Sequence, residues 1–320
     1  MELDERYYKK LKATYLVFKE KRTQQEVAKL LGISRPTLTK FIEEAIAEGI
    51  LKIEVVDVKE VTYLFELEGK IRRKFDMKDV NVVDCISDKH EEITESLGRA
   101  SAKYFESILK SNMKIGISWG STLASFVSHL KVNHNIKNLD IAALVGGSFY
   151  MNTNYHSNIL VHRMLEKYSG REHFLYAPNH IRDPKLYKML MQNEDIKHTL
   201  EIGKQCDIAI VGIGGYFSPD SRISTFTPYV QDQTAVFENK TIVGGINAQF
   251  LGEKGELLDI KVQGLSIGVK LGDFKKINRT MAIAGGEIKH KAILATLRGK
   301  YINTLITDKF TAEYLLKNAE

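Results

Sequence analysis

The sequence has little of what a secreted or membrane-bound protein needs. Its two cysteines, Cys85 and Cys206, are far apart and form no metal-ligand spacing, which argues against a disulfide-stabilised secreted domain. No apolar run is long enough to span a bilayer, and the N-terminal residues MELDERYYKK contain no apolar signal core. These absences predict a soluble, cytoplasmic protein without a membrane partner.

Patterns for metal binding are also missing. The nine histidines form no H-E-x-x-H motif, and His156 and His162 share a segment without the spacing of a metal site. No internal repeat or low-complexity stretch is evident, and a net charge of +6 is too small to indicate a nucleic-acid partner by itself. We therefore expect no metal and no cofactor.

What the sequence does contain indicates two domains. The chain has 320 residues with 43% hydrophobic content, enough for about two domains with buried cores. The charge is unevenly distributed: residues 6–40 contain ten basic and two acidic side chains, ten minus two, or +8. A basic segment of this kind suits attraction to phosphates, although an ordinary solvated helix surface would carry it too.

Residues 23–51 predict two short helices joined by a tight turn. Thr23 is placed to cap the first helix, and Gly32 is placed to end it in the left-handed conformation. Ser34 is placed to cap the second helix, whose first turn tolerates Pro36. The first helix repeats Val27, Leu30 and Leu31 on one face, and the second buries Leu38, Phe41 and Ala45. The pattern is that of a helix-turn-helix.

The second helix of such a motif enters the DNA major groove, where Arg can pair with guanine and Thr can contact a thymine methyl or a phosphate. The alternative is a helical hairpin with a solvated charged face, and the combined turn, cap and spacing favour DNA binding. The predicted partner is a double-stranded operator. The predicted DNA-contacting residues are Ser34, Arg35, Thr37, Thr39 and Lys40.

A third helix and a wing complete this N-terminal domain in the prediction. Residues 4–20 form a first helix that packs on the pair, and the alternation over residues 51–55 suggests an extended wing. The first helix would supply Tyr8, Leu11, Tyr15 and Leu16 to the packing. The predicted domains are residues 1–57 and 58–320, with a helix over residues 61–75 after the boundary.

The C-terminal domain alternates strand and helix, which predicts a Rossmann-like α/β fold with a mainly parallel sheet covered on both faces. Helices are expected at residues 91–109 and 122–130. Strands are expected at residues 80–83, 114–117, 141–145, 174–176, 208–211, 280–284 and 302–306. Ligands of such sheets bind beyond the carboxyl ends of the strands.

The turn GISWGST, residues 116–122, follows a predicted strand and opens a helix. Its glycines let backbone amides approach a ligand, and its hydroxyl groups stand where a helix dipole favours anions, so a phosphate is the expected guest. The same letters match the G-x-S-x-G elbow of serine hydrolases, with Ser118 as nucleophile and His290 as a candidate base. Only one strand of this domain precedes the turn and no HGGG-like segment occurs upstream, which disfavours that alternative.

Three further glycine turns follow predicted strands. Residues 212–215 fail the dinucleotide fingerprint because Phe217 replaces its third glycine, so this turn, which contains Gly214, is a close-approach turn. Gly285 and Gly286 precede Lys289, which could reach a phosphate but lies in no Walker sequence. Gly146 and Gly147 form a weaker fourth turn.

The chain resembles the SorC type of bacterial transcriptional regulator over nearly its whole length. The resemblance rests on the order of QQEVAKLLGISRPTLTKFIEEAIAEGIL, GISWGSTL, LVGG, YAP, CDIAIVGIGG, IAGGEIKHKAI and GKYINTLITDKFTAEYLL. Such regulators resemble sugar-phosphate isomerases and deaminases in the C-terminal domain but sense effectors, typically as tetramers on DNA. The resemblance implies a non-enzymatic regulator that forms homo-oligomers and, by family habit, represses carbohydrate genes.

The resemblance also implies an effector site for a phosphorylated sugar. The implied and motif-derived residues are Gly116, Ser118, Gly120, Ser121, Thr122, Gly146, Gly147, Gly214, Gly285, Gly286 and Lys289. Two departures matter. Val145 stands where the deoxyribose-phosphate sensor of this type has an imine-forming lysine, and Gly245 stands where many members have a sugar-binding aspartate. A sugar-phosphate isomerase or deaminase remains the alternative, with Asp259 or His290 as candidate bases.

Overall fold

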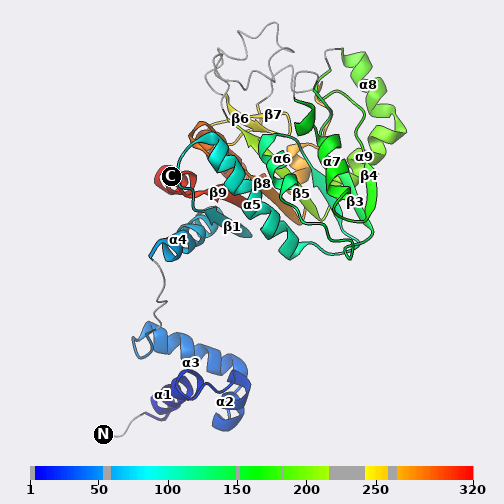
Figure 1. The fold of residues 1–320 in the computed structure, drawn as a ribbon. Coiled ribbons are helices and arrows are strands. Elements are labelled where there is room, and N and C mark those ends of the chain that lie inside the picture. Colours follow the sequence, from blue (N-terminus) through cyan, green and yellow to red (C-terminus); the bar gives the residue numbers. More distant parts are fainter. Residues whose placement is uncertain are drawn as a thin grey trace. The chain divides into compact units, whose positions relative to one another are not determined.

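A computed structural model of the chain describes residues 4–52, 59–148, 152–181, 183–215, 242–258 and 265–319. The chain divides into two compact units, Met1–Thr62 and Tyr63–Glu320, called the head and the body below. Figure 1 shows both units. The division falls shortly after residue 57, where the sequence predicts the domain boundary.

The head contains three helices, α1 (Glu5–Phe18), α2 (Gln24–Leu31) and α3 (Arg35–Ala47). The predicted caps are confirmed. Thr23 and Glu26 form a reciprocal capping box at α2, and Ser34 accepts a hydrogen bond from the Thr37 amide at the start of α3. Gly32 ends α2 in the left-handed region with a φ of 62°, so the tight turn has the glycine that it requires.

The core of the head differs from the sequence prediction. It is built from Ala13, Leu16, Val27, Ala28, Leu38, Phe41 and Ile42. Leu30, Tyr8 and Tyr15 were expected to pack inward but are 58%, 50% and 59% exposed. Helix α1 instead turns the small Ala13 and Thr14 toward its neighbours, because small side chains let α3 approach closely. Of the predicted wing at residues 51–55, residues 53–55 lie outside the described residues.

The body is built on a mainly parallel sheet, as predicted. Seven parallel strands are in the order β1-β9-β8-β5-β2-β3-β4. They are β1 (Asp79–Val83), β2 (Lys114–Ile117), β3 (Leu139–Ala143), β4 (Gly170–His173), β5 (Ile208–Gly214), β8 (Arg279–Ile283) and β9 (Thr304–Asp308). The strands other than the edge strand β4 contribute buried aliphatic side chains to the main core, which is why their sequences are rich in apolar residues.

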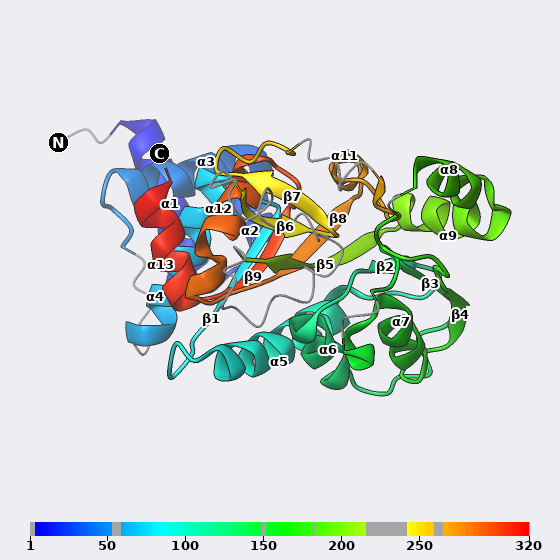
Figure 2. The same cartoon turned by 90° about the horizontal axis from the view of Figure 1, so that it is seen from above.

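Helices cover both faces of the sheet (Figure 2). One face carries α5 (His90–Ile108), α6 (Ser121–Ser128) and α7 (Ser157–Leu165), and the other carries α9 (Glu194–Lys204), α12 (His290–Arg298) and α13 (Lys309–Asn318). Helix α4 (Lys59–Lys74) lies beside edge strand β1, where Glu68 accepts a hydrogen bond from the Val82 amide. The shorter elements are η1 (Thr153–Tyr155), α8 (Pro184–Gln192), α11 (Leu271–Phe274) and η4 (Glu287–Lys289).

Two parts of the body correct the sequence prediction. The strand expected at residues 174–176 is wrong: β4 is the preceding Gly170–His173, an exposed polar edge strand without an apolar signal. The second is an antiparallel hairpin, β6 (Ile242–Ile246) and β7 (Gln249–Gly252), which pairs with the end of β5 and was not among the predicted strands. Asn247 and Ala248 form its two-residue turn with φ angles of 49° and 59°.

The strand order places a topological switch between β2 and β5. From β2 the chain moves outward to β3 and β4, and it then returns to β5 on the other side of β2 before adding β8 and β9. In open α/β sheets ligands bind in the crevice at the carboxyl ends of the strands at such a switch. The fold therefore directs attention to the segments that follow Ile117, Gly214 and Ile283.

Replacing Leu38 by alanine should destabilise the head alone. Leu38 is fully buried between the helices of the head, so the cavity should cost about 2–5 kcal/mol. Hydrogen exchange by mass spectrometry, which follows the two units separately, should show faster exchange in α1–α3 and unchanged exchange in the body. The exposed Leu30→Ala is the matched control, and equal exchange in the two variants would contradict this core assignment.

Candidate functional site

The five predicted DNA-contacting residues lie at and just after the start of α3. Arg35, Thr39 and Lys40 are exposed, as a groove-reading surface requires. Three of the hydroxyl groups form hydrogen bonds within α3: Ser34 caps the helix and its Oγ lies 2.7 Å from Thr37 Oγ1, while Thr39 Oγ1 donates to the Arg35 carbonyl at 3.2 Å. The side chains that remain for the predicted base contacts are therefore chiefly Arg35 and Lys40.

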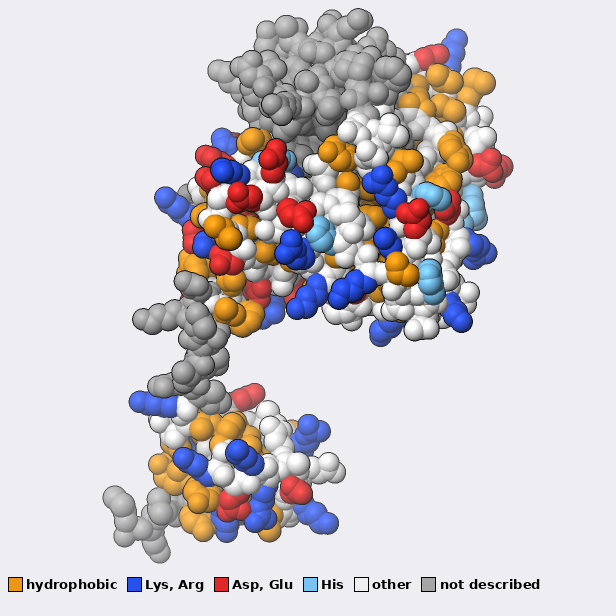
Figure 3. Space-filling view, viewed as in Figure 1, with side chains coloured by type: hydrophobic (Ala, Val, Ile, Leu, Met, Phe, Trp, Pro, Cys, Tyr) orange, Lys and Arg blue, Asp and Glu red, His pale blue; other side chains and the backbone are white. Residues whose placement is uncertain are grey.

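Part of the basic charge of the head is neutralised within the head. Lys10 is buried and donates to Glu48 at 2.5–2.6 Å, which ties α1 to the end of α3. Arg6 likewise donates to Glu44 at 2.6 Å. The space-filling view shows other Lys and Arg side chains spread over the visible face of α1–α3 (Figure 3). Some basic residues of the head thus form ion pairs within it, and other Lys and Arg side chains remain exposed on its surface.

In the body, a cavity of about 1000 Å³ lies at the carboxyl ends of the central strands. Eight of the eleven predicted effector residues line it: Ser118, Gly120, Ser121, Thr122, Gly214, Gly285, Gly286 and Lys289. They come from the end of β5 and from the segments after β2 and β8, so the parallel sheet brings together three regions that are far apart in sequence. Cavities of this size accept small metabolites.

The remaining three predicted residues, Gly116, Gly146 and Gly147, are absent from the cavity lining. At Gly116 and Gly146 there is no room for a side chain, because neighbouring atoms lie too close to the backbone. A Cβ at Gly116 would lie 2.4 Å from Leu144 Cδ2, and one at Gly146 would lie 2.4 Å from the Ala177 carbonyl oxygen. Effector contact by these three residues stays a prediction.

Three helix starts converge on the cavity. The first turns of α5 and α6 and the turn η4 before α12 all contribute lining residues. Helix α6 has Gly120 at its cap position, with a φ of 128° and no capping side chain. Other helices of the chain are capped by side chains, for example α8 by Asp183 and α9 by Asn193. Amides and helix dipoles at these starts favour an anion.

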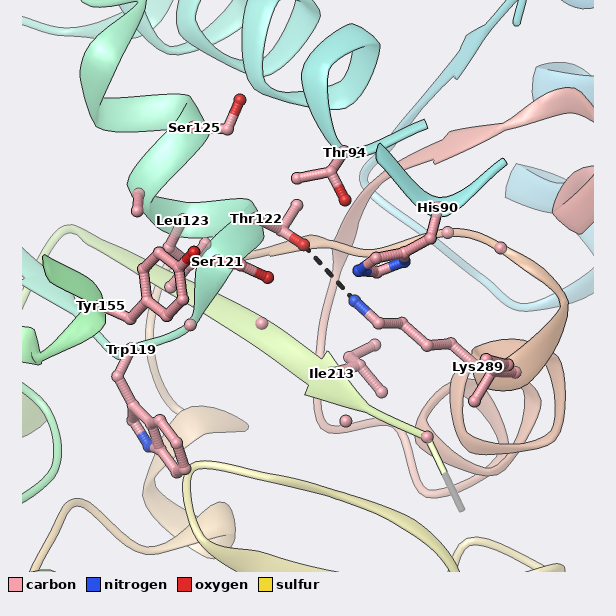
Figure 4. A pocket seen from close by; sticks show the side chains of 18 of the residues that line it. His90, Thr94, Trp119, Ser121, Thr122, Leu123, Ser125, Tyr155, Ile213 and Lys289 are labelled. Atoms are coloured by element: carbon pink, nitrogen blue, oxygen red, sulfur yellow. Dashed lines mark hydrogen bonds between the residues drawn. The ribbon is translucent and has the colours of Figure 1, made fainter. Parts of the chain in front are cut away.

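Lys289 provides the cationic side chain of the cavity. Its Nζ donates to Thr122 Oγ1 at 3.4 Å, across the space between η4 and α6 (Figure 4). Burial lowers the pKa of Lys289 to about 8, while Asp308 acts in the opposite direction. The His90 ring lies beside it, and burial together with the Lys289 charge lowers the pKa of His90. The lysine is charged near neutral pH but poorly solvated, so an anion would stabilise it.

Ser118 is not placed as a nucleophile. Its side chain is 1% exposed and its hydroxyl donates to Asn247 Oδ1 at 2.8 Å, an amide oxygen that cannot serve as a general base. Asn247 also donates to the carbonyls of Leu144 and Val269, so it fastens the β6–β7 hairpin beneath the cavity. The candidate triad member His290 stacks on Tyr314 in α13. The candidate base Asp259 lies outside the described residues.

The two departures from the family pattern have structural consequences. Val145 has no amine that could form an imine with a ligand. Its side chain is also fully buried and absent from the cavity lining. Gly245 does line the cavity, and a Cβ there would lie 2.6 Å from the Gln249 carbonyl oxygen. An aspartate at 245 would thus require a shift of the hairpin backbone.

The cavity has a second, different end. Trp119 and Tyr155 lie away from Lys289 (Figure 4), and Gln249 and Phe250 of the hairpin also contribute to the lining. Aromatic faces and amides suit the carbon skeleton and hydroxyl groups of a sugar. The cavity can therefore hold a molecule with an anionic group at one end and a polyol at the other.

The sequence reasoning missed His90, Thr94 and Asn247 as lining residues. His90 begins a helix without any motif, and Asn247 carries only a hairpin-turn signal, so neither had a local pattern that indicates a site.

Within the described residues, no group of three or more His, Cys, Asp or Glu side chains could hold a metal ion. Within the same residues, no helix combines the length and apolarity needed to cross a bilayer.

A helix-turn-helix head followed by an α/β body with an effector cavity defines a ligand-responsive DNA-binding regulator. Comparison with known proteins agrees. The model of the Sugar-bind family, which describes a sugar-binding domain, matches residues 59–317. The chain belongs to this family, and it is a transcriptional regulator of the SorC type.

Named relatives cover nearly the whole chain. The deoxyribonucleoside regulator of Bacillus subtilis is 27% identical over 308 residues, 96% of this chain and 97% of that protein. The full-length crystal structure of the sorbitol operon regulator SorC of Klebsiella pneumoniae gives a TM-score of 0.74 at 26% identity, covering 96% of this chain and 98% of that chain. A transcriptional regulator from Streptococcus pneumoniae gives 0.75 at 28% identity, covering 81% and 98%.

Binding of inorganic phosphate should weaken as the pH rises through 8. The dianion interacts with the charged form of Lys289, and that form is lost above its pKa of about 8. Above pH 8 binding should therefore require proton uptake, and affinity should fall by up to about tenfold per pH unit. Fluorescence of Trp119, the single tryptophan, reports binding from inside the cavity lining.

Lys289→Met should weaken phosphate binding at pH 7 and remove this alkaline dependence. Lys291→Met is the matched control, because the Lys291 side chain is 66% exposed and pairs with Glu253 outside the cavity lining. An unchanged alkaline dependence in Lys289→Met would assign the titration to a different group.

Proposed function

We propose that the body binds a phosphorylated sugar and that this binding changes the affinity of the head for its operator DNA. The single observation that carries the proposal is the convergence of three helix starts on Lys289 and Thr122. A phosphate monoester satisfies the amides and the lysine there, while the Trp119 end of the cavity accepts the sugar. The names of the relatives, a deoxyribonucleoside regulator and a sorbitol operon regulator, support a carbohydrate effector.

The proposal includes a non-enzymatic role in the cytoplasm as a homo-oligomer that represses carbohydrate genes. The buried Ser118 hydroxyl, bonded to an amide rather than a base, supports binding without turnover. Two free, buried cysteines suit a reducing compartment, where operator DNA is found. Regulation requires the effector to bind the DNA-competent and DNA-incompetent states with different affinity, because equal binding would shift nothing.

A thermal-shift panel of sugar phosphates and their unphosphorylated parent sugars tests this function. We expect a subset of the phosphates to raise Tm at 1 mM and their parent sugars to have little effect, because the helix starts and Lys289 act on the phosphate. Each hit is then assayed for turnover by chromatography, with Ser118→Ala as control. Product formation that Ser118→Ala abolishes would establish an enzyme instead, and equal shifts from parent sugars would overturn the phosphate requirement.

Replacing Arg35 by alanine should weaken binding to a duplex from the protein's own promoter. Arg35 is exposed at the start of α3, where one bidentate base contact is worth about 1–3 kcal/mol, or roughly 5- to 150-fold in affinity. Fluorescence anisotropy should also show steep weakening with salt. The matched control is Arg171→Ala on the exposed edge strand β4 of the body. Equal losses in the two variants would remove α3 as the reading helix.

A further inference from the structure

Asp308 is an unusual carboxylate. It ends β9 in the centre of the body, it is 0% exposed, and no other Asp or Glu among the described residues is buried. A carboxylate in that position is tolerated only when hydrogen bonds replace its lost water. Asp308 Oδ1 accepts from the Thr311 amide at 2.8 Å, and Oδ2 accepts from Thr311 Oγ1 at 2.6 Å and from the Gly286 amide at 2.8 Å.

These bonds join two elements with different roles. Thr311 lies in the first turn of α13, for which Asp308 is the cap, whereas Gly286 belongs to the turn that carries Lys289 into the cavity. The turn lies directly against the carboxylate, since a Cβ at Gly285 would be 2.1 Å from Asp308 Oδ2. Any shift of this turn must therefore move or break the cap of α13.

A second contact joins the same two elements. His290, the residue after Lys289, begins α12 and stacks on Tyr314 of α13, with ring centroids 4.4 Å apart and planes inclined by 26°. The neighbouring Glu313 accepts a hydrogen bond from Tyr63 Oη of α4 at 2.8 Å. Contacts therefore run without a break from Lys289 in the cavity to α4, the helix that begins at the end of the head.

We propose that Asp308 is the positioning residue that transmits occupation of the cavity to α13 and α4. This inference rests on the proposed phosphate-binding function. A phosphate beside Lys289 acts on the turn of residues 285–289 from the cavity side, whereas the Asp308 carboxylate holds the Gly286 amide of the same turn from the protein side, so phosphate binding changes the forces on this turn. Because the turn and the cap of α13 share one carboxylate, α13 must respond, and α4 follows through Glu313 and Tyr63.

Hydrogen exchange of the full-length protein, with and without inorganic phosphate, tests the inference. In the unmodified protein phosphate should slow exchange in residues 118–124 and 285–292 and change exchange in α13 and residues 61–74 by about 5-fold or more, the lower end of typical couplings. In Asp308→Asn, which keeps the size but loses the charge and replaces one of the two acceptor oxygens by a donor NH2 group, the cavity segments should still respond. The response of α13 and α4 should fall below about twofold.

Tyr63→Phe provides a second variant that is distant from the cavity and on an exposed side chain, so it tests the inference even if Asp308→Asn fails to fold. It should retain the phosphate response in α13 and lose it in α4. The matched control is Tyr176→Phe, whose ring is 77% exposed elsewhere on the body and which should behave like the unmodified protein.

The outcomes separate this inference from the function on which it rests. No protection of the cavity segments by phosphate in the unmodified protein would overturn the phosphate site itself. Protection of those segments without any change in α13 and α4 would leave the site standing and overturn the role of Asp308. A full α13 and α4 response in Asp308→Asn would overturn that role as well.

Discussion

The parallel pairing of β2, β5 and β8 is the constraint on which the rest of the body depends. Register pairs such as Ile117 with Ile210, and Val211 with Ala282, bring the carboxyl ends of the three strands to one edge. Each strand then leads into a turn that lines the cavity, and two of these turns lead into helices. Backbone hydrogen bonding, which is independent of side-chain identity, thus gathers segments separated by up to half of the chain.

Bringing these segments together concentrates positive charge in the cavity, which favours binding of an anion. Helix starts concentrate partial positive charge, and a glycine cap at α6 leaves the local amides without a side-chain acceptor. Lys289 adds a full charge in a poorly solvated place, which is why its pKa falls to about 8. Opposing charge comes from Asp308 on the protein side of the turn and from Asp88, Glu91, Glu95 and Glu287 in the cavity lining. An anionic ligand would complete the balance from the cavity side.

In the head, the interactions that define the ends of α2 and the start of α3 are local in sequence. The capping box of Thr23 with Glu26, the left-handed Gly32 and the Ser34 cap all join residues a few positions apart. These contacts define two helices and the turn between them before any distant packing is considered. They explain why α3 and its exposed Arg35 and Lys40 could be located from the order of residues.

The sequence by itself determined what depends on neighbours along the chain: the caps of α2 and α3, most strands of the body, and the glycine turns that lead to Ser121, Gly214 and Gly286. Tertiary structure decided the rest. It placed Ala13 and Leu16 rather than Tyr8 and Tyr15 of α1 in the head core. It made the polar β4 an edge strand, placed His90 and Asn247 in the lining of one cavity, and placed Asp308 against the turn that carries Lys289. Those placements depend on strand pairing over long separations, which leaves no periodic signal in the sequence.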